Sequence, residues 1–242
     1  MTSKIFNRPR TLKVSSFTRR TSSEEIISDE QFCVDLPIKS IPKGRVHGSN
    51  HFKELGLDNF EYRINYREKY GFTIVTRELA ETLSAVILSV TQTNSLDAHA
   101  PVIEIGAGLG TLTKALNLVG TKTIGYDKFT FNNRYFGSLP KKIRDGDIYK
   151  AMKEHHQSRI FVVSWPNHST PFAHDVAQVI PKGSILFYLG EVKGGCTADD
   201  NFFNYVEAAF KPHPQHEKTL GRAHLSWAGV HDTWSVVEKI VD

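Results

Sequence analysis

Cysteine and long apolar stretches are scarce in this sequence. Its two cysteines, Cys33 and Cys196, lie far apart and outside any CxxC or Cys/His spacing, so neither a disulfide framework nor a metal site is expected. Unpaired cysteines fit a reducing compartment, and we expect a cytoplasmic protein. Uninterrupted apolar runs such as 85–88 (AVIL) are far shorter than the roughly 20 residues that cross a bilayer. No membrane partner is therefore expected.

Acidic side chains are absent before Glu24, whereas this stretch is rich in lysine, arginine, serine and threonine. Its few apolar residues recur at no regular spacing, which is typical of a segment that packs little. We expect residues 1–45 to form a flexible basic arm and linker. Three interpretations stay open: a solvated tail, an arm that touches nucleic-acid phosphates, or an organellar transit peptide. The formal charge of +4 permits an anionic partner without requiring one.

Aromatic and charged residues are concentrated in the next segment, 46–100, which we expect to be helical in part and to pack on the core. Its aromatic residues either cover the edge of a sheet or form a wall over a bound ligand, and they are Phe60, Tyr62, Tyr66, Tyr70 and Phe72. Apolar residues at positions 79, 83, 86, 87 and 90 have the spacing of an amphipathic helix. Thr76 is a suitable N-cap for that helix.

The core is predicted over 101–242, and it begins with the stretch 101–116, PVIEIGAGLGTLTKAL. This stretch is typical of a short buried strand, a glycine-rich turn and an apolar helix. Gly106, Gly108 and Gly110 let the backbone turn sharply and approach a ligand closely. Such a strand–turn–helix unit holds nucleotide-like ligands at the carboxyl edge of a parallel sheet.

Further strands are predicted over 122–127, 143–147, 159–165 and 184–191, with helices between them. A T-x-x-D signal at Thr197 predicts a helix that runs to about residue 210. Two closing antiparallel strands are predicted over 223–228 and 233–241. This order indicates an α/β fold: a Rossmann-like, seven-stranded, mostly parallel sheet with a C-terminal antiparallel hairpin and helices on both faces.

Glu104, two residues before the first glycine, changes the ligand expected at the turn. A dinucleotide turn reads G-x-G-x-x-G, but here Thr111 stands at the third position and the extra glycine is Gly110. A carboxylate beside the turn would repel a pyrophosphate and suits a ligand that carries a cation. The stretch 104–110, EIGAGLG, resembles motif I (D/E-x-G-x-G-x-G) of class I S-adenosylmethionine methyltransferases. Supporting features, among them Asp127 about twenty residues later, extend the resemblance over roughly 70–242.

The resemblance implies a methyltransferase with S-adenosyl-L-methionine as its cofactor. Residues at the glycine turn would line the methionine end of the cofactor, and they are Glu104, Gly106, Ala107, Gly108 and Gly110. Asp127 would accept hydrogen bonds from the ribose hydroxyls, and Asp147 would lie near the adenine amine. Tyr70 and Phe72 would form an aromatic wall. The residues alone leave two other roles open, because Asp127 is also suited to cap a helix and Asp147 to a turn.

The segment after the fourth predicted strand is where such enzymes meet their substrate. Ser164, Trp165 and Pro166 are the candidates here. Amino-methylating DNA and RNA enzymes carry [D/N/S]-P-P-[Y/F/W] at this place, and Trp165 and Asn167 depart from that pattern. The chain also resembles a little-characterised methyltransferase-like group, through Y-x-x-x-Y-G-F at 66–72, W-P at 165–166, GE-x-x-GG-x-TADD-x-FF at 190–203, and His-Asp at 231–232.

Glu191 opens a glycine-containing loop after the fifth long strand and is the candidate catalytic base or binder of a cationic substrate. The methyl acceptor itself is not predicted and is a small molecule, a protein or a nucleic acid. Two other functions stay open. One is a non-catalytic binding module that uses the basic arm on nucleic acid, and the other is a nicotinamide oxidoreductase, against which Glu104 and the missing third glycine argue.

Overall fold

The computed structural model describes residues 60–128 and 143–242, without the side chain of Tyr62. The basic arm predicted over 1–45, and the helix expected between the second and third core strands, lie outside the described residues. Within them, the element order alternates strands and helices after two initial helices.

A seven-stranded sheet in the order β3-β2-β1-β4-β5-β7-β6 forms the centre of the described part of the chain. Its first five strands run parallel, whereas β7 pairs antiparallel with both β5 and β6. The Rossmann-like fold class with a C-terminal antiparallel pair is thus confirmed. The strands are β1 (Val102–Ile105), β2 (Thr123–Asp127), β3 (Arg144–Asp145), β4 (Ile160–Ser164), β5 (Ile185–Gly190), β6 (Phe210–Pro212) and β7 (Thr233–Lys239).

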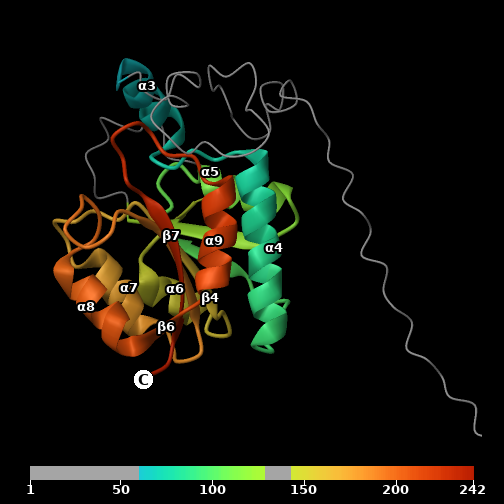
Figure 1. Cartoon of the computed structure of the whole chain (residues 1–242). Helices are drawn as coiled ribbons and strands as arrows, with labels where there is room; N and C mark the ends of the chain where they lie inside the picture. Colours follow the sequence, from blue (N-terminus) through green and yellow to red (C-terminus); the bar gives the residue numbers. More distant parts are fainter. Residues whose placement is uncertain (1–59, 129–142) are drawn as a thin grey trace, which may run out of the picture.

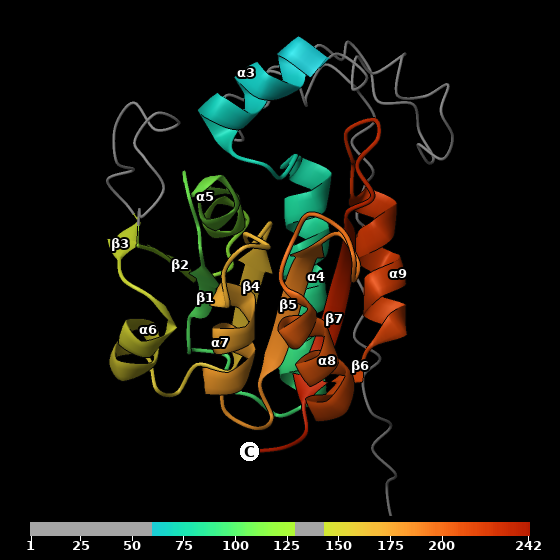
Figure 2. The same ribbon diagram turned by 90° about the vertical axis from the view of Figure 1, so that its left-hand side faces the viewer.

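Helices cover both faces of this sheet (Figure 1). On one face lie α4 (Arg77–Thr93), α5 (Thr111–Leu118) and α9 (Pro214–Ala223), and on the other lie α6 (Ile148–Glu154), α7 (Phe172–Val179) and α8 (Asp200–Ala209). Successive strand residues point to opposite faces, so Phe187 packs in the first layer whereas Leu186 and Tyr188 pack in the second. The remaining helix of the described residues, α3 (Phe60–Tyr70), crosses above the carboxyl ends of the parallel strands (Figure 2).

The predicted amphipathic helix is confirmed as α4. Thr76 caps it, because its side chain accepts a hydrogen bond from the Leu79 N–H at 3.0 Å. Leu79, Leu83 and Val90 are buried on its sheet-facing side, as the spacing requires. Asn94 ends the helix.

Two sequence predictions in the last third of the chain are wrong. The strand expected over 223–228 is the end of α9 and a loop, and the sixth strand is instead Phe210–Pro212. Pro214 starts α9, as proline favours a first helical turn. The helix after the 191–199 loop is capped by Asp199, which accepts from the Phe202 N–H at 3.0 Å, and not by Thr197. Thr197 accepts from the Glu191 N–H instead, at 2.7 Å.

A buried lysine joins the carboxyl end of α7 to the sheet. Lys239 is 2% exposed, and its Nζ donates to the backbone oxygens of Gln178 and Ile180 at 2.7 and 2.9 Å. A cation at this end of a helix complements both the unpaired carbonyls and the helix dipole.

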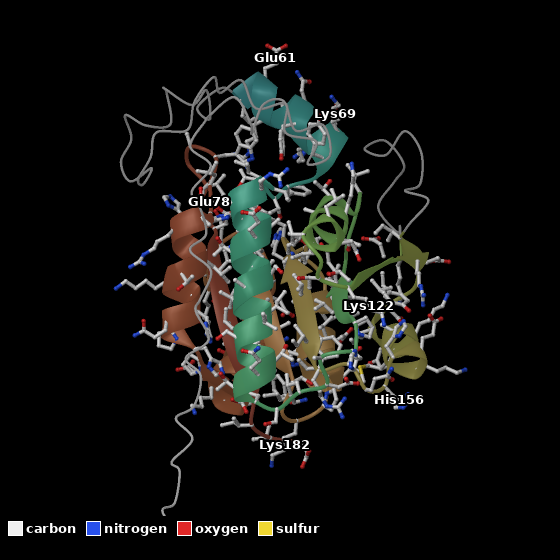
Figure 3. The ribbon with its side chains drawn as sticks, turned by 90° about the vertical axis from the view of Figure 1, so that its right-hand side faces the viewer. Glu61, Lys69, Glu78, Lys122, His156 and Lys182 are labelled. Atoms are coloured by element: carbon white, nitrogen blue, oxygen red, sulfur yellow. The ribbon has the colours of Figure 1, made fainter. Side chains whose placement is uncertain are left out.

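We expect Lys239→Met to lower the free energy of unfolding by about 2–3 kcal/mol, because hydrogen bonds to a charged group contribute about that much and one buried and one part-buried carbonyl lose their donor. Urea denaturation measures the change. The matched control is Lys182→Met, since Lys182 is exposed at the end of the molecule opposite to α3 (Figure 3). Equal effects of the two substitutions would contradict the assigned role of Lys239.

Candidate functional site

A cleft of about 700 Å³ opens at the carboxyl edge of the parallel strands, under α3. Its walls come from α3 and the segment after it, from the glycine turn, and from the loops that follow β2, β3, β4 and β5. Polar groups from several strand ends converge here because parallel strands present their carboxyl ends at one edge. The residues predicted for the site that line this cleft are Tyr70, Phe72, Glu104, Gly106, Ala107, Gly108, Asp127, Asp147, Ser164, Trp165 and Pro166. Gly110 and Glu191 are not among the lining residues.

The glycine turn is held against the end of β2 by its own amides. The N–H groups of Gly106 and Ala107 donate to the backbone carbonyl oxygen of Tyr126 at 2.8 and 3.0 Å. The Gly108 N–H donates to Asp127 Oδ2 at 2.8 Å. Gly108 has a φ of 51°, and a Cβ placed on it would meet no atom within 4 Å. The turn therefore presents bare backbone to the cleft and fixes the Asp127 carboxylate beside it.

Gly110 has a different task from Gly106 and Gly108. It is the N-cap of α5 with a φ of 73°, and a Cβ there would approach Ile143 Cδ1 to 2.5 Å. The lack of a side chain at Gly110 thus permits close packing behind the turn. This packing, rather than contact with the cleft, explains a glycine at this position.

Glu104 is the most deeply buried acid of the cleft, with 2% of its surface exposed. Its carboxylate accepts a hydrogen bond from the Thr113 hydroxyl. Burial raises the pKa of Glu104 to about 7, because desolvation outweighs the Thr113 hydrogen bonds and nearby Asp127 adds to the rise. A buried carboxyl that titrates near neutrality gains stability as an anion when a cation lies next to it.

Asp147 caps a helix and also lines the cleft, whereas its contact with an adenine amine stays a prediction. Its side chain caps α6 by accepting from the Lys150 N–H at 3.0 Å, and it also lines the cleft. Lys128 Nζ lies 2.6 Å from its other carboxylate oxygen. The hydrogen bond from Lys128 holds the pKa of Asp147 below its usual range.

The aromatic segment is joined to the glycine turn through α3. The hydroxyl of Thr111, at the start of α5, donates a hydrogen bond to the backbone carbonyl oxygen of Tyr70 at 2.6 Å. Tyr70 is buried, whereas Phe72 is 46% exposed and stacks on Trp165 with ring centroids 5.5 Å apart and planes 19° apart. Of the predicted aromatic set, Phe60 is exposed on α3 and Tyr66 packs edge-on against Trp227.

Trp165 has a left-handed backbone, with a φ of 51°, which is a costly conformation for a bulky residue. Its backbone N–H donates to the Leu189 oxygen at 2.8 Å, and its indole Nε1 donates to Asp232 Oδ2 at 3.0 Å. His224 Nε2 lies 3.2 Å from the second oxygen of Asp232. Burial acts to raise the pKa of Asp232, but contacts with His224, Ser226 and Trp165 outweigh it, and the pKa lies below its usual range.

The loop that begins at Glu191 lies against the segment after β4. Asn167 and Thr197 form an isolated antiparallel bridge, and the Ala198 N–H donates to the Pro166 oxygen at 3.1 Å. Cys196 and Thr197 line the cleft, so the two loops form one wall. Both loops thus stand at the carboxyl edge of the parallel strands.

Glu191 itself holds this wall together. Its Oε2 accepts from the Cys196 N–H at 2.7 Å and its Oε1 accepts from the His231 N–H at 3.2 Å. The Cys196 hydrogen bond leads the contacts that keep the pKa of Glu191 below its usual range. A lowered pKa makes a carboxylate a weaker base, so these contacts favour a positioning role over the predicted catalytic one.

We expect Glu191→Ala to speed amide hydrogen exchange at Cys196 and His231 by about tenfold, because each amide loses its carboxylate acceptor. Ligand affinity at the glycine turn should stay within about twofold, since Glu191 does not line the cleft. Glu207→Ala, on an exposed part of α8, is the control. Loss of turnover with unchanged amide exchange would restore Glu191 as a catalytic candidate.

Several lining residues were missed by reasoning from sequence, and they are Arg63, Arg67, Lys128, Tyr149, Asn167, Phe172, Asp175 and Thr197. Half of them directly follow a strand, as Lys128 does, or lie in the first turn of a helix, as Tyr149, Phe172 and Asp175 do, and no sequence motif marks these places. Among the residues that the structure describes, no three His, Cys, Asp or Glu side chains gather as a metal site. None of the described helices is long and apolar enough to cross a membrane.

No protein-family model and no curated protein matches the chain. The comparisons with known proteins found similarity to solved structures. The chain is similar to the 23S rRNA methyltransferase ErmE (14% identity over 65% of this chain and 68% of that one, TM-score 0.34). It is also similar to TrmN from Thermus thermophilus (12% identity over 69% of this chain and 49% of that one, TM-score 0.35). A third similar structure is the E81Q mutant of MtNAS in complex with S-adenosylmethionine (12% identity over 79% of this chain and 76% of that one, TM-score 0.41). The chain spans about half the length of TrmN. At such scores, the chemistry of the cleft must carry the functional argument.

Proposed function

We propose that the cleft binds S-adenosyl-L-methionine and that the protein transfers its methyl group to an acceptor. One observation carries the proposal: the buried Glu104 carboxyl, the bare glycine turn and Asp127 lie together on one wall of the cleft. An anion beside the turn is unsuited to a pyrophosphate and suited to a cationic ligand. The resemblance of 104–110 to motif I agrees with this choice.

The residues of this wall fit the cofactor by their chemistry. Glu104 would compensate the positive charge of the methionine end, which a buried carboxyl near neutrality does well. Asp127 would accept from the ribose hydroxyls while still holding the Gly108 N–H. Asp147 would accept from the adenine amine, beside the exposed ring of Tyr149.

The bound cofactor would supply an activated methyl group on a sulfonium. The protein's contribution would then be mainly to position the acceptor nucleophile in line with that group and to exclude water. The part of the cleft proposed for this task lies at the carboxyl end of β4 and is lined by Ser164, Trp165 and Pro166.

Calorimetry with S-adenosylhomocysteine tests the proposal directly. We expect one molecule to bind per chain, with affinity in the micromolar range that is common for cofactor sites, and NAD to bind at least about 100-fold more weakly. Equal or tighter binding of NAD would contradict the proposal and indicate a dinucleotide-binding site. Absence of binding by both would leave the cleft without its proposed cofactor.

A further inference from the structure

The second wall of the cleft differs in chemistry from the one that carries Glu104 and Asp127. It is formed by the inner side of α3 and the residues after it, together with the turn after β4. Arg63 and Arg67, one helical turn apart, line it from α3, and Phe72 and Trp165 line it below. The Arg67 guanidinium lies over the Phe72 ring, 5.3 Å from its centroid.

The aromatic part of this wall is rigidly held. Trp165 is fixed at its backbone by Leu189 and at its indole by the buried Asp232 carboxylate. A left-handed conformation at a tryptophan persists only where surrounding contacts impose it. Phe72 stacks on this fixed ring and is itself 46% exposed. The cleft thus presents a preorganised pair of aromatic rings, which lowers the entropy cost of binding a planar group.

The charges of the cleft are divided between its walls. Its four acids are Glu104, Asp127, Asp147 and Asp175, and none belongs to α3 or the segment after it. Lys128 belongs with the acids, because it pairs with Asp147 and its pKa is raised by that hydrogen bond, with Asp175 as a weaker contributor. The α3 wall therefore combines two guanidinium groups with an aromatic surface. Guanidinium groups bind carboxylate and phosphate in preference to neutral groups.

We propose that the acceptor bound at this wall is a planar anion: an aromatic ring that carries a carboxylate or a phosphate. The ring would lie against Phe72 and Trp165, and Arg63 with Arg67 would bind the acidic group. This inference rests on the proposed function, because it assigns the glycine-turn wall to the cofactor and leaves the α3 wall to the acceptor. Both anionic groups satisfy the same guanidinium chemistry, so the experiment distinguishes an aromatic carboxylate from a nucleotide.

The test uses the full chain saturated with S-adenosylhomocysteine, so that added probes cannot occupy the cofactor wall. Four probes are titrated by calorimetry: salicylate, adenosine monophosphate, benzylamine and cyclohexanecarboxylate. We expect salicylate or adenosine monophosphate to bind at least about tenfold more tightly than benzylamine, the aromatic cation, and than cyclohexanecarboxylate, the non-planar anion. Which of the two anions binds identifies the acidic group. Failure of both anions, or equal binding of benzylamine, overturns the inference.

Two variants assign the binding to the wall. Arg63→Gln should weaken the preferred anion about tenfold, whereas Arg222→Gln, on an exposed part of α9, should leave it unchanged. Phe72→Ala should remove the preference for the planar anion over cyclohexanecarboxylate, and Leu118→Ala, exposed to a similar degree on α5, should preserve it. Unchanged anion affinity in both Arg63→Gln and Phe72→Ala would contradict the assignment of the binding to this wall.

The first titration separates this inference from the proposed function. If S-adenosylhomocysteine fails to bind the wild-type chain, the proposed function fails and the acceptor assignment falls with it. If it binds and the planar anions do not, the cofactor assignment stands and the acceptor class is wrong. Binding of single-stranded RNA in place of the small anions, at the same saturated protein, would likewise replace the small-molecule acceptor by a nucleic acid.

Discussion

Asp127→Asn is expected to weaken S-adenosylhomocysteine binding by roughly 10- to 150-fold. Asp127 ends β2 and faces the turn, where its Oδ2 already accepts from the Gly108 N–H at 2.8 Å. Hydrogen bonds to a charged group contribute about 1.5–3 kcal/mol, and each 1.4 kcal/mol is a factor of ten in affinity. Asparagine keeps an oxygen for the Gly108 amide but loses the charge and one acceptor. The loss should therefore appear in ligand binding more than in folding, and calorimetry measures it.

A neighbouring acid supplies the control for this experiment. Asp145 pairs with Asp127 in the β2–β3 register, is exposed, and does not line the cleft. Asp145→Asn should bind the ligand as the wild type does. Both variants should unfold at similar urea concentrations, because neither substitution removes buried apolar surface. If Asp127→Asn bound S-adenosylhomocysteine with unchanged affinity, the proposed contact between Asp127 and the ribose would be wrong.

The glycine-turn wall of the cleft could be predicted from sequence because its signals are local. The strand, the glycine turn and Asp127 lie within 102–127, where burial pattern, glycine conformation and an acid at a strand end each leave a mark. The β1–β2 pairing then places Asp127 beside the turn, since parallel strands in register end at the same edge. Sequence spacing thus determines this part of the site almost completely.

The α3 wall of the cleft could not be predicted in the same way because it depends on contacts between distant segments. Trp165 and Asp232 are separated by 67 positions, and no spacing rule joins them. Arg63 and Arg67 look like solvated helix charges until α3 is seen above the strand ends. Likewise, the true sixth strand has only three residues and two of them are exposed, so its pairing with β7 left no hydrophobic pattern to detect.

Glu104 links ligand binding and stability to pH, with opposite signs. Its folded pKa of about 7 lies above the ordinary value of 4.5, so its contribution to stability is fully present below pH 4.5 and is lost as pH rises through 7. A shift of this size corresponds to about 3 kcal/mol. The stability difference between wild type and Glu104→Gln should change by about that amount between pH 4.5 and pH 8, to the relative disadvantage of the wild type. Urea denaturation at both pH values measures it, and Glu78→Gln, on the exposed side of α4, is the control.

Binding should follow the opposite trend. A cationic ligand favours the ionised carboxyl, so the affinity for S-adenosylhomocysteine, with its charged amine, should rise about tenfold from pH 6 to pH 8 as the free protein ionises Glu104. Glu104→Gln keeps an oxygen for the Thr113 hydroxyl but cannot ionise, and its affinity should be lower and nearly independent of pH over this range. Calorimetry in buffers of different ionisation enthalpy should detect a proton released on binding at pH 6.5 in the wild type alone. A flat wild-type profile would mean that the ligand's cation lies away from Glu104, and it would contradict the assignment of the glycine-turn wall to the cofactor.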